Sequence, residues 1–114
     1  MANYDNLPVY KVCYDLLIDL FRISGNMQRD YRFTLGESMK KELVDLIVNI
    51  YRANCRYEKK ELLAKGRENI EIIRLLLRLT NDLKQMSLKE FVTVNEFIES
   101  ISKQLAAWHK SCKI

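Results

Sequence analysis

The chain has 114 residues, of which 48% are hydrophobic and 30% are charged, and its formal net charge is +4. This length predicts one domain over residues 1–114, and three glycines and one proline are too few for a disordered or a β-sheet protein of this apolar content. No apolar run is long enough to span a membrane, and the N-terminus lacks a secretory signal. We therefore expect an all-α, cytoplasmic protein.

The first predicted helix begins at Leu7 and Pro8, because a first helical turn tolerates a proline that has no N–H to donate. It extends to about Ile23. Gly25 or Asn26 then suits the left-handed position beyond a helix C-terminus. The apolar residues that recur at intervals of three and four along this helix are Tyr10, Cys13, Tyr14, Leu17, Ile18, Leu20 and Phe21.

The second predicted helix begins at Thr34, because Thr34 to Glu37 has the S/T-x-x-E form of a capping box. It should reach Ala53 or Asn54. Gly36 lies in its first turn, where glycine costs up to about 1 kcal/mol, and close approach of another backbone would explain it. The predicted apolar face consists of Met39, Leu43, Leu46, Ile47, Ile50 and Tyr51.

The third predicted helix, from about Lys60 through Lys84, carries more apolar surface than one neighbour can cover. Its apolar residues form two adjacent rows. The first row contains Ile70, Ile73 and Leu77, and the second contains Ile72, Leu76, Leu79 and Leu83. We expect the second row to remain uncovered in an isolated four-helix domain.

The remaining face of this helix carries a line of charged residues at intervals of three and four, which are Arg67, Glu71, Arg74, Arg78 and Asp82. Glu71 can pair with Arg67 or Arg74, and Asp82 with Arg78, so one interpretation is a solvated, self-paired ridge. The other is a binding surface, because Arg74 and Arg78 are like charges one turn apart that an anion would stabilise.

The fourth predicted helix begins at Ser87, where Ser87 to Glu90 has the form of a second capping box, and it continues to the C-terminus. Its predicted apolar residues are Leu88, Phe91, Val94, Ile98, Ile101, Leu105, Trp108 and Cys112. Four helices joined by short links must alternate in direction, which predicts an antiparallel up-down-up-down four-helix bundle.

The sequence carries no signature of an enzyme, since phosphate-binding, dinucleotide-binding, hydrolase and zinc-protease motifs are all missing. His109 and Cys112 lie one turn apart and could act as two metal ligands or a thiolate–imidazole pair, but such a pair is more often a surface histidine beside a packed cysteine. Three distant cysteines without a C-x-x-C motif favour reduced thiols. We expect no catalytic activity, no metal and no cofactor.

Basic residues are concentrated around the junction of the second and third helices. They are Arg52, Arg56, Lys59, Lys60, Lys65 and Arg67, with Lys110 and Lys113 at the C-terminus. Clustered cations can neutralise phosphates without regard to sequence. Tyr51 and Tyr57 could stack on bases, although Tyr51 also fits the core pattern. The alternative is a solvated surface with cations at helix C-termini.

Five stretches resemble one known family, namely Leu7–Tyr10, Thr34–Glu37, Ile50–Asn54, Ile73–Leu79 and Leu105–Trp108. This is the four-helix-bundle family of 23S rRNA intervening-sequence proteins and of the accessory variability determinant (Avd-like) proteins of diversity-generating retroelements. The resemblance covers nearly the whole chain. It implies a homo-oligomer, which in the accessory branch is a five-fold barrel of bundles, and it matches the family's helix-three arginines to Arg74 and Arg78.

The accessory branch implies a protein that binds nucleic acid through a basic surface and associates with the element's reverse transcriptase during mutagenic copying. We therefore expect a homopentamer with reverse transcriptase and RNA or DNA as partners, and with no membrane association. The expected nucleic-acid contacts are Arg74, Arg78, Arg67, Arg52, Arg56, Lys59 and Lys60. The alternative is an interaction protein of the intervening-sequence type, without nucleic-acid affinity.

Overall fold

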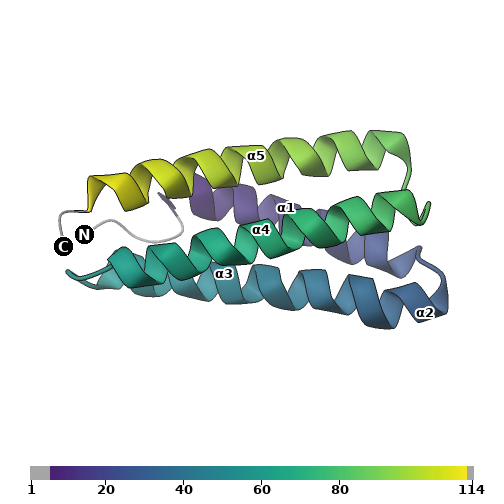
Figure 1. Cartoon of the computed structure of the whole chain (residues 1–114), viewed down its shortest axis with the longest axis horizontal. Helices are drawn as coiled ribbons and strands as arrows, with labels where there is room; N and C mark the ends of the chain where they lie inside the picture. Colours follow the sequence, from purple (N-terminus) through teal and green to yellow (C-terminus); the bar gives the residue numbers. More distant parts are fainter. Residues whose placement is uncertain (1–5, 113–114) are drawn as a thin grey trace.

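Four long helices lie side by side in the computed structural model of the chain, which describes residues 6–112 (Figure 1). Figure 1 shows that each long helix runs in the opposite direction to the one before it. α1 packs on α3 and α5, and α4 packs on the same two helices. The long helices are α1 (Pro8–Gly25), α3 (Glu37–Cys55), α4 (Lys60–Asp82) and α5 (Leu88–Ser111). The prediction of an all-α four-helix bundle is confirmed.

The core is built from one apolar row on each helix. Cys13 lies inside it, and burial raises the pKa of its thiol to about 12, so the side chain packs as a small neutral residue. Cys55 and Cys112, like Cys13, form no disulfide in the structure. The side chains that fill the core include Leu16 and Leu20 of α1, Leu43, Leu46 and Ile50 of α3, Ile70, Ile73 and Leu77 of α4, and Ile98, Ile101 and Leu105 of α5.

The predicted apolar face of α1 is only partly correct. Cys13 and Leu20 are buried as expected, but Tyr14, Ile18 and Phe21 are exposed. The row that faces the core instead runs through Val9, Leu16 and Ile23. Two apolar rows lie next to each other on this helix, and periodicity alone does not tell which of them a neighbouring helix will cover.

The predicted capping box at Thr34 is wrong. Helical structure begins earlier, with α2 (Arg29–Tyr31) and the π-helical turn η2 (Arg32–Gly36), which leads directly into α3. The Thr34 hydroxyl donates to the carbonyl of Asp30 at 2.9 Å, which is the backward bond of a threonine inside a helix. The box at Ser87 is confirmed, since Ser87 Oγ accepts from the N–H of Glu90 at 3.1 Å and the Glu90 carboxylate accepts from the N–H of Ser87 at 2.8 Å.

The predicted left-handed residue after α1 is also wrong, because Asn26 is right-handed (φ −99°) and no glycine among residues 6–112 has positive φ. The left-handed residue lies after α4, at Lys84 (φ 60°). There the N–H of Lys84 donates to the carbonyl of Asn81, and the N–H of Gln85 donates to that of Thr80, each at 3.0 Å. This Schellman closure ends α4 at Asp82 without a glycine, two residues before the predicted end.

Gly36 of η2 lies directly against Ser24 of α1. A Cβ atom added there would lie 2.3 Å from Ser24 Oγ and 3.1 Å from Ser24 Cβ. The close approach expected at this glycine is therefore present, although the neighbour is a side chain of α1 rather than a backbone.

We expect Gly36→Ala to destabilise the fold by about 1–3 kcal/mol, because the new methyl group forces Ser24 and its helix away from η2. Urea denaturation followed by circular dichroism measures the loss. The double variant Gly36→Ala/Ser24→Gly removes the clashing atoms and should recover most of it. Equal stabilities of the single variant and the unmodified chain would contradict the contact.

None of the helices within residues 6–112 combines the length and the apolar character that a bilayer span requires.

Candidate nucleic-acid interface

The positive charge of the chain is concentrated at one end of the bundle. Residues 52–67 carry six lysines or arginines and two glutamates, a surplus of four that equals the net charge of the whole chain. Residues 68–112 carry six charges of each sign. The six cations, called the basic end below, are Arg52, Arg56, Lys59, Lys60, Lys65 and Arg67.

Local structure brings these cations together. α3 ends at Cys55, the backbone is extended at Arg56 (φ −118°, ψ 150°), and α4 begins at Lys60. Because the link is only four residues long, the last turn of α3 and the first turns of α4 lie at the same end of the molecule (Figure 1). Lys59 and Lys60 stand at the N-terminus of α4, where the helix dipole favours negative charge, so a bound anion would relieve their repulsion.

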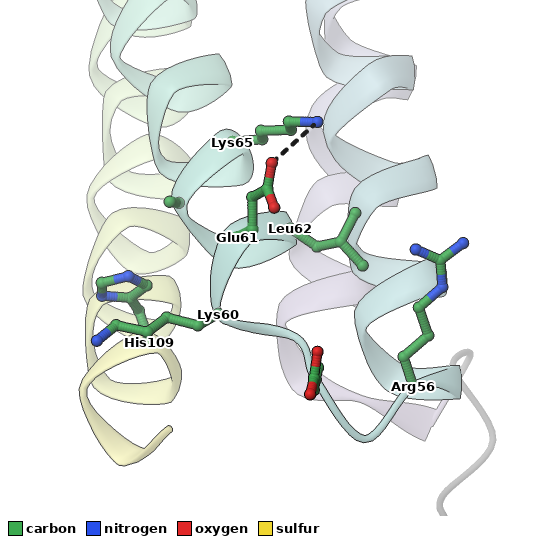
Figure 2. A pocket seen from close by; sticks show the side chains of 8 residues that line it. Arg56, Lys60, Glu61, Leu62, Lys65 and His109 are labelled. Atoms are coloured by element: carbon green, nitrogen blue, oxygen red, sulfur yellow. Dashed lines mark ion pairs between the residues drawn. The ribbon is translucent and has the colours of Figure 1, made fainter. Parts of the chain in front are cut away.

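A pocket opens at this end between α4, α5 and the link (Figure 2). In Figure 2, Lys60 extends toward His109 of α5, and Arg56 lies across the pocket at the end of α3. Glu61 holds Lys65 only loosely, at 3.9 Å, and both side chains are largely exposed. The residues that line the pocket are Arg56, Glu58, Lys60, Glu61, Leu62, Ala64, Lys65 and His109.

The C-terminal turn of α5 supports the basic end. Arg67 Nη1 lies 3.3 Å from His109 Nδ1, and because a guanidinium can only donate, the imidazole nitrogen is the acceptor. Lys59 Nζ lies 5.7 Å from the centre of the Trp108 ring. The Cys112 thiol donates a hydrogen bond to the Trp108 carbonyl. The side chain that contacts the His109 ring is therefore Arg67, and not Cys112. Within residues 6–112, no three His, Cys, Asp or Glu side chains come together as a metal site.

Arg74 lies outside the basic end, and its charge is already compensated. It pairs with Glu71 on its own helix at 3.2 Å, as predicted, and also with Glu99 of α5. Burial acts to lower the pKa of the guanidinium, but the hydrogen bonds and charges of Glu99 and Glu71 outweigh burial, and the pKa is raised. The pair between Arg74 and Glu99 was not predicted from the sequence, because the register of α5 against α4 depends on how the two helices pack. Arg74 is therefore a permanent cation held between two carboxylates.

Arg78 lies one turn further along α4, and it does not form the predicted pair with Asp82. It is eleven residues beyond Arg67, about 16 Å along the helix axis. The structure thus gathers five of the seven predicted contacts, Arg52, Arg56, Lys59, Lys60 and Arg67, and leaves Arg74 and Arg78 on a separate part of α4. It adds Lys65 and His109 to the site. Lys113 lies outside the described residues.

Among residues 6–112, many large apolar side chains are exposed, and ten of them fall into two groups. The first, called the α4 apolar row, contains Ile72, Leu75, Leu79 and Leu83, and Leu75 is the most exposed of them at 66%. The second, called the α1–α3 apolar face, contains Tyr14, Ile18, Phe21, Val44, Val48 and Tyr51. Lys40 of α3 lies 4.4 Å above the Phe21 ring of α1 and joins the two helices of this face. Of the row predicted to stay uncovered, Ile72, Leu79 and Leu83 are exposed as expected, but Leu76 is partly buried against the core, and Leu75 is exposed in its place.

A comparison with protein families finds one matching family model, described as bAvd-like, which matches residues 9–112. The match begins in the first turn of α1 and ends just after α5, so it includes all four long helices. No curated protein matches the chain at a significant level. A match over nearly the full length is sufficient to establish membership, and the chain belongs to the bAvd-like family.

Proposed function

We propose that the protein is a non-enzymatic accessory protein of a diversity-generating retroelement. In this role it binds nucleic acid and the element's reverse transcriptase and supports mutagenic copying of a template. Membership of the bAvd-like family supports the role as a whole, and the association with reverse transcriptase rests on that membership alone. The observation that carries the nucleic-acid part is the basic end, where the entire charge surplus of the chain is gathered.

The chemistry of the basic end suits a phosphate backbone. Arg52, Arg56 and Lys60 are exposed, and the adjoining carboxylates Glu58 and Glu61 are too few to neutralise them. Arg67 gives one N–H to His109 and keeps the rest of its guanidinium for an anion. Lysines and arginines placed in this way bind phosphates independently of base sequence and release condensed counterions, which makes the affinity depend on salt.

The proposed protein acts as a homo-oligomer, and the accessory branch implies five copies. Support comes from the α4 apolar row and the α1–α3 apolar face, which are carried by different helices of the bundle. Apolar patches of this extent are typical of interaction sites. Two different patches that bind each other from copy to copy generate a closed ring when the rotation between copies allows it.

A mobility-shift experiment with a labelled single-stranded RNA tests the nucleic-acid part. We expect a shift at about 50 mM salt that weakens by at least tenfold at about 200 mM, since several phosphate contacts are lost together. The absence of a shift at low salt would favour the other branch, an interaction protein of the intervening-sequence type without nucleic-acid affinity.

A further inference from the structure

One aromatic side chain at the basic end lies outside the core of the bundle. Tyr57 lies in the link between α3 and α4 and is 85% exposed, more than any other large hydrophobic side chain among residues 6–112. A link of this kind needs no aromatic residue, because turn conformations depend on small or polar residues. Its ring gains nothing from the core and is held in water beside Arg56.

We propose that the basic end binds unpaired nucleotides and that Tyr57 stacks on one of their bases. This inference rests on the proposed function and names the class of nucleic acid. Arg56 precedes the tyrosine in the chain, and Lys59 and Lys60 follow it after Glu58, so these cations would bind phosphates next to the stacked base. Every base has a π-face, so stacking on tyrosine recognises a single strand without reading its sequence.

A duplex does not satisfy this arrangement. Its bases are already stacked inside the helix, and its outer surface offers phosphates to the lysines and arginines but no ring face to Tyr57. A surface that bound duplexes would therefore use the cations alone. The cations alone would bind any polyanion, and the exposed tyrosine would make the surface selective for single strands.

The other exposed aromatic side chains are less suited to this role. Phe21 is covered by Lys40, and Tyr14 and Tyr51 belong to the α1–α3 apolar face. Trp108 is half-buried beneath Lys59. Phe33, 60% exposed in η2, lies beside Arg29 outside the basic end. Tyr57 is thus the exposed aromatic side chain that belongs to the link at the basic end.

Fluorescence anisotropy with two labelled probes tests the proposal, a single-stranded oligouridine and a blunt duplex with the same number of phosphates. We expect tighter binding of the single strand, and about a tenfold or greater loss of that affinity in Tyr57→Ala. The duplex affinity and the salt dependence should not change, because no phosphate contact is removed. Tyr57→Phe should bind as the unmodified chain does.

Phe33→Ala is the matched control, since it removes an exposed aromatic ring beside a cation elsewhere on the surface, and it should leave both affinities unchanged. If Tyr57→Ala binds the single strand as tightly as the unmodified chain, stacking is refuted while salt-dependent binding, and with it the proposed function, stands. If neither probe binds at low salt, both the proposed function and this inference fail.

Discussion

Replacing Arg52, Arg56 and Lys60 with alanine is expected to lower nucleic-acid affinity by about 100-fold at 0.1 M salt, because each lost phosphate contact removes the release of close to one counterion. The slope of log affinity against log salt should fall by about 2–3 for the same reason. All three side chains are exposed, so the core is untouched. Titrations of a labelled single strand at four or more salt concentrations measure both quantities.

The control for this variant is Lys41→Ala/Lys89→Ala/Lys103→Ala. It removes the same number of charges from exposed positions outside the basic end. At physiological ionic strength charges are screened within about 8 Å, so distant lysines should contribute little and the affinity should fall by no more than a few-fold. Equal losses in the two triple variants would show that net charge, rather than a localised site, determines binding.

The second large effect is expected from Leu75→Glu in the α4 apolar row. Leu75 is 66% exposed in the single chain, so a glutamate there leaves the bundle stable. In an assembly that buries this row, the carboxylate would be taken out of water without a partner, which costs several kcal/mol. We therefore expect the mass in light scattering at micromolar concentration to fall from about five times 13.5 kDa to the mass of one chain.

Val92→Glu provides the control for self-association. Val92 is 48% exposed on α5 and belongs to neither apolar surface defined above, so the same charge placed there should leave the assembly intact. A single-chain mass for the unmodified protein would refute the proposed oligomer. An unchanged assembly in Leu75→Glu would show that copies do not meet through the α4 apolar row.

The sequence was sufficient to predict the helices and the bundle, because apolar periodicity reports directly on which face can be buried. It was less reliable at helix ends. Thr34 and Ser87 begin the same S/T-x-x-E pattern, yet only Ser87 caps a helix, because the residues before Thr34 are themselves able to continue one. At Lys84 the left-handed conformation was not predicted, because a lysine, unlike a glycine or an asparagine, gives no indication of it in the sequence.

The candidate site was predictable where its residues are close in sequence. Arg52, Arg56, Lys59 and Lys60 lie on either side of one short link, so any antiparallel pairing of α3 and α4 gathers them. Arg74 differs from these residues, because its charge is compensated in part by Glu99, a carboxylate 25 residues away in the sequence. His109 likewise joins Arg67 across 42 residues. These two contacts depend on the register of α5 against α4, which cannot be predicted from the composition of the sequence or the spacing of its residues.

The position of the basic end has a consequence for any cyclic assembly of this chain. Copies related by rotation about one axis keep equivalent atoms at equal heights along that axis, so every link between α3 and α4 would lie on the same rim. A flexible strand that touched one subunit would meet the next at a high effective concentration. Weak individual attachments would then add up to strong avidity, and a polymer long enough to follow the rim would be retained in preference to a short fragment.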